Sequence, residues 1–241
     1  FNKQLQSFGI GIVAWFIFAK IDYRFWKLNA LWMLIITLGL LLAVFIPGLG
    51  MESGGAHRWI SLGSFSFQPA EITKLTFLIY LAAWLSKKGE GIRDLQSGFI
   101  PFVVIVGLIG LLIIKQPDMG TMSVISFIAA LMFFVAGASW QHVVAGVTSA
   151  FVFFIFLIKS APYRFQRLLT FLNPQGEELG ASYHITQSLM AIGSGGLLGI
   201  GFGQSKAKLL YLPEAHTDSI FAIIVEELGF IRAILVILMF V

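Results

Sequence analysis

The sequence predicts an all-α polytopic membrane protein, and its composition and the spacing of its apolar runs support that fold class. Of the 241 residues, 58% are hydrophobic and only 12% are charged, about half the charged fraction of an ordinary soluble domain. Glycine, proline or charge interrupts the apolar runs about every 15 to 20 residues, the spacing of successive bilayer crossings. We therefore expect residues 1–241 to form a single transmembrane domain.

Apolar segments that we predict to cross the bilayer run from one end of the chain to the other. They are Leu5–Ala19, Leu28–Ile46, Ala70–Leu85, Phe99–Ile114, Met119–Ala136, Val143–Ile158 and Ser219–Val241. Several are shorter than the roughly 20 residues that a spanning helix needs, so we expect their ends to extend into the flanking sequence. Both termini look cut, which predicts further spans beyond them.

Basic residues in short connections predict the orientation. They cluster at Lys20, Arg24 and Lys27, and again at Lys87, Lys88 and Arg93. The positive-inside rule places both clusters in the cytoplasm. Alternation then puts the loop 47–68, the turn 115–118 and the long loop 159–217 outside. Within that loop, the glycine-rich segment 182–203 is expected to be re-entrant or surface-packed, since a full crossing would move Asp218 to the other side.

Asp218 is the carboxylate of greatest interest, because it follows Thr217 at the start of the last apolar segment. One interpretation is structural: Asp218 or Thr217 caps the helix by accepting hydrogen bonds from its first backbone N–H groups. The other is that Asp218 is a general base at the membrane surface, with its pKa raised by apolar surroundings. Neither interpretation excludes the other.

Two further carboxylates lie at the ends of spans. Glu71 and Lys74 are three residues apart just after Pro69, so they share one helix face. They form either an ion pair that locks two helices or a polar cavity that accepts a headgroup. Asp118 is predicted to cap the helix that follows it, and it could also orient the base or hold a metal.

The remaining candidate residues are predicted to lie in the outer loops. Arg58 and Trp59 suit the membrane interface, where Trp is common. Alternatively they bind a substrate, with Arg58 on a phosphate and Trp59 on the face of a sugar. The basic residues Arg164, Arg167, Lys206 and Lys208 suit either lipid headgroups or the stabilisation of a pyrophosphate leaving group. His216 lies beside Asp218 and is counted with these substrate-binding candidates.

Several classes of function are not supported by the sequence. The glycines from Gly193 to Gly203 fit neither of the glycine-rich nucleotide-binding patterns, so no nucleotide is expected. The four histidines lack paired ligand spacing, which argues against structural zinc. The absence of cysteine excludes disulfides and thiolate chemistry. The net charge of +4 is ordinary for cytoplasmic loops, and nucleic acid is not an expected partner.

Consecutive motifs resemble those of the SEDS family, which includes FtsW, RodA and SpoVE. They are Gly55–Ile60, Phe67–Leu75, Gln116–Thr121, Phe171–Pro174, Tyr183–Ser188, Ala191–Gly196, Tyr211–Asp218 and Glu226–Gly229. The resemblance covers essentially the whole chain. It implies a ten-helix fold of which about seven helices are present, without the first and the last two. The sequences of the segments Gly201–Glu214 and Ala215–Gly229 resemble FtsW more than RodA.

The resemblance implies a peptidoglycan glycosyltransferase that polymerises lipid II, with Asp218 as the family's essential acid. It also implies that Glu71 and Lys74 form a polar cavity and that Trp59 and Asp118 contribute on the outer face. A divalent cation (magnesium or manganese) at the pyrophosphate and a class B penicillin-binding protein as the transpeptidase partner fit the same resemblance, as do other divisome or elongasome membrane proteins.

The implied location is the bacterial cytoplasmic membrane, with the active site facing outside. Two rival functions remain open. One is a lipid II flippase, which would depend most on Glu71 and Lys74. The other is a scaffold that only recruits the transpeptidase, for which no single acid should matter.

Overall fold

The structure is a computed structural model that describes residues 2–53, 56–62, 65–172, 181–210, 212 and 217–240. The contacts within the chain group into two compact units, Phe1–Phe151 and Val152–Val241. The prediction of a single transmembrane domain stays a prediction.

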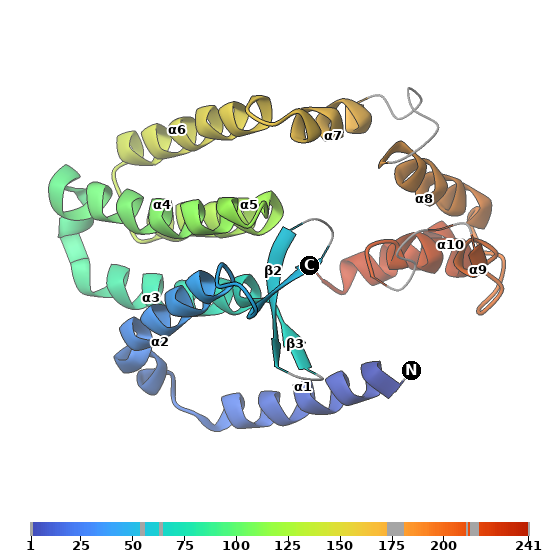
Figure 1. The fold of residues 1–241 in the computed structure, drawn as a ribbon, viewed down its shortest axis with the longest axis horizontal. Coiled ribbons are helices and arrows are strands. Elements are labelled where there is room, and N and C mark those ends of the chain that lie inside the picture. Colours follow the sequence, from blue (N-terminus) through green and yellow to red (C-terminus); the bar gives the residue numbers. More distant parts are fainter. Residues whose placement is uncertain are drawn as a thin grey trace. The chain divides into compact units, whose positions relative to one another are not determined.

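The first unit is built from helices with one small sheet (Figure 1). Its helices are α1 (Asn2–Lys20), α2 (Tyr23–Ala43), α3 (Pro69–Lys88), α4 (Ile100–Lys115) and α5 (Met119–Val135), with the short helices η1 (Gly89–Arg93) and η2 (Leu95–Phe99) between α3 and α4. Helix α6 (Trp140–Lys159) begins in this unit and continues into the second.

The second unit contains the end of α6 followed by α7 (Pro162–Leu172), α8 (Ala181–Gly195), α9 (Ala207–Leu210) and α10 (Ile220–Leu238). Each apolar segment that the sequence predicts corresponds to one helix, α1 to α6 or α10. The long loop 159–217 contains α7, α8 and α9.

Length and hydropathy identify which helices are suited to span a membrane. The segments Tyr23–Ala43, Leu95–Lys115 and Trp140–Lys159 are long and apolar enough, and Leu5–Lys20 and Met119–Val135 are shorter apolar helices. Their exposed surfaces are rich in large apolar side chains, such as Phe127 and Phe151. Such a surface suits contact with lipid rather than water. The prediction of an all-α polytopic membrane protein is confirmed.

The core of the first unit lies between α2, α3, α4 and α5. Buried Leu41, Leu81, Ile109 and Phe133 represent these four helices in one apolar cluster. Helix α3 starts with Pro69 in its first turn and ends with Lys87 and Lys88, the arrangement that suits the helix dipole.

A three-stranded antiparallel sheet replaces the plain outer loop that the sequence suggests between residues 47 and 68. Strands β1 (Gly50–Ser53), β2 (Ala56–Leu62) and β3 (Phe65–Phe67) lie in the order β1-β2-β3, with an irregular register at Met51 and Glu52. Figure 1 shows the sheet at the N-terminal end of α3, with η1 and η2 at its other end. In β2, Ile60 is buried and its neighbour Trp59 is exposed, as expected for successive residues on opposite faces of a strand.

The second unit is organised by a break in its last helix. Helix α10 is interrupted at Gly229, whose φ of 81° lies in the left-handed region. The glycine-rich segment after α8 fills the break. Ile200 N–H donates to the Glu226 carbonyl, while Phe230 N–H donates to the Gly196 carbonyl, both at 3.0 Å. The segment thus satisfies the backbone groups that the break releases, as irregular backbone at membrane depth requires.

Residues 196–201 pack into the break in α10, while the prediction that 182–203 is re-entrant or surface-packed stays a prediction. Helix α8 has 15 residues and is therefore about 22 Å long, shorter than the roughly 30 Å of a hydrocarbon core. Its Ala191 packs in an apolar cluster with Ala222 and Ile223 of α10.

Candidate functional site

Arg58 fastens the sheet to the turn that ends α4. Its Nε donates to the Gln116 carbonyl at 2.8 Å, and its Nη2 donates to the Pro117 carbonyl at 2.6 Å. These carbonyls belong to a helix C-terminus, where backbone acceptors lack partners within the helix. Arg58 therefore has a structural function in addition to the substrate contact predicted for it, which stays a prediction. Trp59, next to it in β2, is 37% exposed.

Asp118 caps α5, as the structural interpretation predicts. Its Oδ1 accepts from the Thr121 N–H at 3.0 Å, and its Oδ2 accepts from the Thr121 hydroxyl at 2.8 Å. Gln68, directly before α3, donates to Oδ2 at 3.0 Å. The loop 47–68 and the turn 115–118, which were predicted to share one face, thus meet in the structure.

Glu71 and Lys74 form an ion pair within α3 itself. Lys74 Nζ and Glu71 Oε1 are 2.8 Å apart, and the two side chains are 33% and 57% exposed, respectively. The pair does not lock two helices together, because both residues belong to α3. Its contribution to a headgroup cavity stays a prediction.

Asp218 lies at the head of α10 with an exposed side chain. The N-cap position belongs to the next residue, Ser219, so neither Asp218 nor Thr217 occupies it. Among the described residues, none donates a hydrogen bond to the Asp218 carboxylate or forms an ion pair with it. The capping interpretation of Asp218 is therefore not supported, while its carboxylate stays open to a ligand.

Ser219 is the N-cap residue of α10, yet its side chain makes no capping bond. Its Oγ lies 3.0 Å from Nε2 of His184 on α8 instead. Ser219 is 3% exposed, so this contact ties the residue after Asp218 to the neighbouring helix. Sequence reasoning did not single out this pair, because the two residues are far apart in the chain.

Glu226 and Glu227 are buried carboxylates in α10, at 3% and 8% exposure. Glu226 accepts from the Ser205 hydroxyl and from the Lys206 N–H. Glu227 accepts from the N–H groups of Gly203 and Ser205. Sequence reasoning used these glutamates only as part of a motif. Two adjacent carboxylates within an apolar helix were the signal that could have identified them.

Lys208 pairs with one of these glutamates. Its Nζ lies 2.7 Å from Glu227 Oε1 and donates to the Gly203 carbonyl at 2.7 Å. Lys206 has an exposed side chain. Arg164 donates to the Tyr163 hydroxyl at 2.9 Å and to the Leu157 carbonyl at 3.1 Å. The binding of a pyrophosphate by these three residues stays a prediction.

Two candidates cannot be placed in this way. The Arg167 side chain and the whole of His216 lie outside the described residues. The described part of the chain contains no group of three histidine or acidic side chains that could hold a metal ion. The divalent cation therefore stays a prediction. Asp218 belongs to the second unit, whereas Trp59 and Asp118 belong to the first. That the three residues share one outer face therefore also stays a prediction.

Comparison with known proteins assigns the family. Residues 1–241 match the family described as "Cell cycle protein", which comprises FtsW, RodA and SpoVE. The chain belongs to this SEDS family. It is 44% identical over 239 residues to stage V sporulation protein E of Bacillus subtilis strain 168, covering 99% of this chain and 65% of the relative.

Other SEDS relatives support the same assignment. The chain is 41% identical to a probable peptidoglycan glycosyltransferase FtsW of Trichlorobacter lovleyi, covering 99% of this chain and 63% of the relative. Because relatives named SpoVE and FtsW both match, the leaning toward FtsW stays a prediction. The chain thus spans just under two thirds of the length of these curated relatives.

Solved structures of SEDS-type proteins share the fold. One chain of a peptidoglycan synthase complex aligns with a TM-score of 0.77 at 25% identity, covering 98% of this chain and 65% of that one. The rod shape determining protein RodA of Thermus thermophilus aligns with a TM-score of 0.53 at 27% identity, covering 63% of this chain and 49% of that one.

Proposed function

We propose that this chain is the catalytic part of a peptidoglycan glycosyltransferase that polymerises lipid II at the outer face of the cytoplasmic membrane. Membership of the SEDS family and relatives named as probable peptidoglycan glycosyltransferases support the reaction class. The position and exposure of Asp218 support the choice of catalytic residue.

The observation that carries the proposal is the contrast between Asp218 and the other carboxylates discussed above. Asp118 caps α5, Glu71 pairs with Lys74, and Glu226 and Glu227 are held by backbone and side-chain donors. Asp218 is exposed and has no such partner among the described residues. A general base must have free lone pairs within reach of the hydroxyl that it deprotonates. The exposure of the Asp218 carboxylate supports its assignment as that base.

The proposed reaction is a direct displacement at the anomeric carbon of the donor sugar. Asp218 accepts the proton of the acceptor's 4-hydroxyl while that oxygen forms the new glycosidic bond. The bond to the pyrophosphate breaks, and its electron pair leaves with the lipid pyrophosphate. Because the nucleophile enters opposite the leaving group, the anomeric configuration inverts.

The other candidates are assigned to the two ends of the substrate. Leaving-group charge must be stabilised by nearby cations, and we assign this function to Arg164, Arg167, Lys206 and Lys208. The sugar and headgroup contacts are assigned to Arg58, Trp59, Glu71, Lys74, Asp118 and His216. A magnesium or manganese ion at the pyrophosphate would supply further positive charge.

A class B penicillin-binding protein is the proposed partner. The peptidoglycan synthase complex that contains a similar chain is described as coordinating polymerisation and crosslinking. Crosslinking is transpeptidase chemistry, which a separate catalytic chain would supply.

The test uses the full-length protein with its transpeptidase partner and fluorescently labelled lipid II. We expect glycan strands from the wild type and none from Asp218→Asn. The control is Asp94→Asn, which changes another exposed carboxylate, one that caps η2, on the face predicted to be cytoplasmic. It should polymerise normally, because Asn caps a helix about as well as Asp. Polymer from Asp218→Asn at the wild-type rate would remove Asp218 as the base.

The flippase alternative is addressed by a second assay on the same proteins. Glu71 and Lys74, on which that alternative depends, are already paired with each other in α3. We expect Glu71→Gln to leave lipid II translocation across sealed vesicles unchanged. The flippase would be favoured if Glu71→Gln lost translocation while Asp218→Asn still polymerised lipid II normally.

A further inference from the structure

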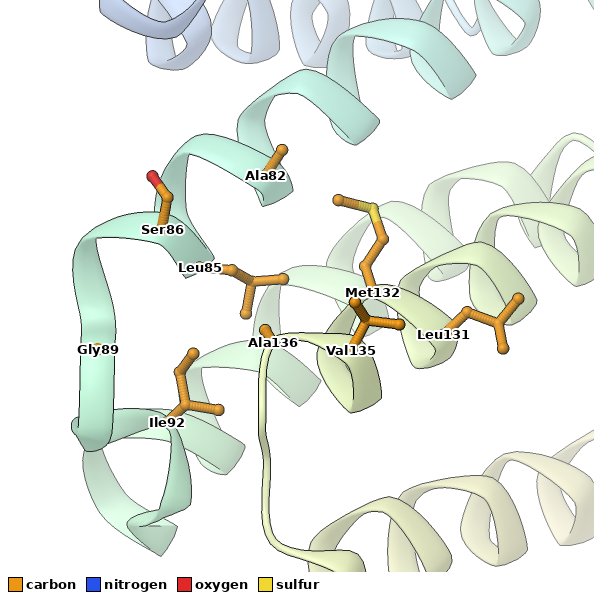
Figure 2. Close-up of a pocket in the computed structure, with 9 residues that line it drawn as sticks. All are labelled: Ala82, Leu85, Ser86, Gly89, Ile92, Leu131, Met132, Val135 and Ala136. Carbon is orange, nitrogen blue, oxygen red and sulfur yellow. The ribbon is translucent and has the colours of Figure 1, made fainter.

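A cavity of about 540 Å³ lies between the C-terminal ends of α3 and α5. Figure 2 shows Leu85 and Ile92 on the side of α3 and η1, with Met132 and Val135 on α5 across the space. Ser86 is the one hydroxyl-bearing residue among the lining side chains, which are otherwise apolar or glycine. The volume lies within the roughly 300–1,000 Å³ that small-molecule sites occupy.

Arg93 bridges the two walls of this cavity. Its Nε donates to the Gly137 carbonyl at 3.3 Å. Ile92 and Ala136, the residues directly before Arg93 and Gly137, both line the cavity. A guanidinium has five N–H donors in a rigid fork that matches phosphate oxygens. The contact places the Arg93 guanidinium beside Gly137, the residue that follows lining Ala136.

Further basic residues are adjacent in sequence to lining residues. Lys87 directly follows Ser86 and is exposed. Lys88 Nζ lies 5.5 Å from the centre of the Trp84 ring. Two carboxylates lie nearby, Glu90 and Asp94, and Asp94 is engaged by the Ser97 N–H at 2.8 Å. Three cations against two carboxylates leave the rim positive.

The depth of the cavity suits a lipid. Its lining starts at Ala82, about 9 Å before Lys88 along the helix axis. The basic end of α3 is predicted to lie at the cytoplasmic surface, so the cavity lies just beneath the headgroups. Anionic lipids are concentrated in the cytoplasmic leaflet and attract clustered basic residues near the surface.

We propose that this cavity is a binding site for one anionic phospholipid of the cytoplasmic leaflet. The lipid phosphate contacts Arg93 and Lys87, and one acyl chain fills the space lined by Leu85, Ile92 and Val135. The proposal rests on the first unit alone and is independent of the chemistry assigned to Asp218.

The test is native mass spectrometry of the full-length protein released from vesicles that contain equal amounts of phosphatidylglycerol and phosphatidylcholine. We expect the wild type to retain one phosphatidylglycerol in preference to phosphatidylcholine. Arg93→Gln should lower this preference about tenfold, equivalent to the loss of one charge-assisted hydrogen bond of about 1.4 kcal/mol. Ala82→Phe should reduce the retention of both lipids, because its ring fills the cavity.

The matched control is Arg24→Gln, which removes an exposed arginine on the same predicted face but outside the cavity. It should retain phosphatidylglycerol as the wild type does. Equal losses in Arg24→Gln and Arg93→Gln would show only general attraction to the surface and would overturn the proposal. Full retention by Ala82→Phe, or no preference in the wild type, would also overturn it.

Folding is checked by thermal unfolding in phosphatidylcholine alone, where the four proteins should have similar midpoints. If Arg93→Gln unfolds at a lower temperature than the wild type, it is compared with Arg93→Lys at a temperature where both variants are folded. Arg93→Lys keeps the positive charge and should therefore retain more phosphatidylglycerol than Arg93→Gln. Soluble glycerophosphate should not displace the lipid, since it lacks the acyl chain.

Discussion

At the scale of single residues, the polar groups of the first unit mainly hold backbone in place. Arg58 donates hydrogen bonds to two carbonyls at the end of α4, and Asp118 accepts one from a backbone N–H in the first turn of α5. Gln116 is 1% exposed, and its amide donates to the Leu41 carbonyl at 3.0 Å. Each removes an unpaired backbone group, which is costly where water is scarce.

Arg58→Ala is expected to destabilise the first unit. Two carbonyls lose a charged donor, so the free energy of unfolding should fall by about 2 kcal/mol. The stability of Arg58→Lys should lie between those of the wild type and Arg58→Ala, because one ammonium cannot reproduce the contact of a guanidinium with two carbonyls. Thermal unfolding in detergent measures both variants against Arg24→Ala, whose side chain is exposed. Equal midpoints for Arg58→Ala and Arg24→Ala would contradict the fastening function of Arg58.

At the scale of elements, the exchange of hydrogen bonds at the break in α10 is the main structural device of the second unit. In an unbroken helix, Phe230 and Ile231 N–H would donate to the carbonyls of Glu226 and Glu227. Here those carbonyls accept from Ile200 and Gly201, while Phe230 and Ile231 donate to Gly196 and Leu197. The inserted segment thus replaces two helical bonds with four.

Gly199→Ala should disrupt this insertion. Gly199 has a φ of +83°, and a Cβ there would overlap the backbone of Glu227 and Leu228. Backbone strain and overpacking together predict a loss of about 2 to 4 kcal/mol. Gly193→Ala is the matched control, because a Cβ at that helical position meets no atom within 4 Å. It should be neutral or stabilising by up to about 1 kcal/mol.

The yield of monodisperse protein and its thermal unfolding in detergent compare these two glycine variants. The same midpoint for Gly199→Ala and Gly193→Ala would show that the segment 196–201 is not inserted into α10 as described.

At the scale of the whole molecule, the two units carry different parts of the proposed function. The first holds most of the residues assigned to sugar and headgroup contacts, while the second holds Asp218 and the basic residues assigned to the pyrophosphate. The proposal requires the sheet and the segment before α10 to face outside and the connection between α3 and α4 to face the cytoplasm.

The absence of native cysteine allows this topology to be tested directly. We expect Ser66→Cys and Lys206→Cys to react with a membrane-impermeant maleimide added to intact cells. Gln96→Cys should react only after permeabilisation. All three positions have exposed side chains, so a lack of labelling reports sidedness rather than burial. Labelling of Gln96→Cys in intact cells would show that the connection between α3 and α4 faces outside, which contradicts the predicted orientation.

Helix positions were predictable from the sequence because apolar length and breakers act locally. The segments predicted for α3 and α5 differ from the observed helices by three residues or fewer at either end. The sheet was missed because β1 and β3 have only four and three residues and glycines separate the strands, a pattern typical of a loop. The break in α10 was missed because Val225–Phe230 is compatible with a continuous helix.

The sequence by itself determined the membrane-protein class, the helical segments and the family motifs, and it predicted a catalytic function for Asp218. Only the tertiary structure decided which carboxylates are already occupied. Asp118, Glu226 and Glu227 find donors that lie 50, 21 and 24 residues away in the chain. Partners at such separations are set by packing rather than by local pattern. Among the described residues, the exposed Asp218 carboxylate accepts no hydrogen bond and forms no ion pair.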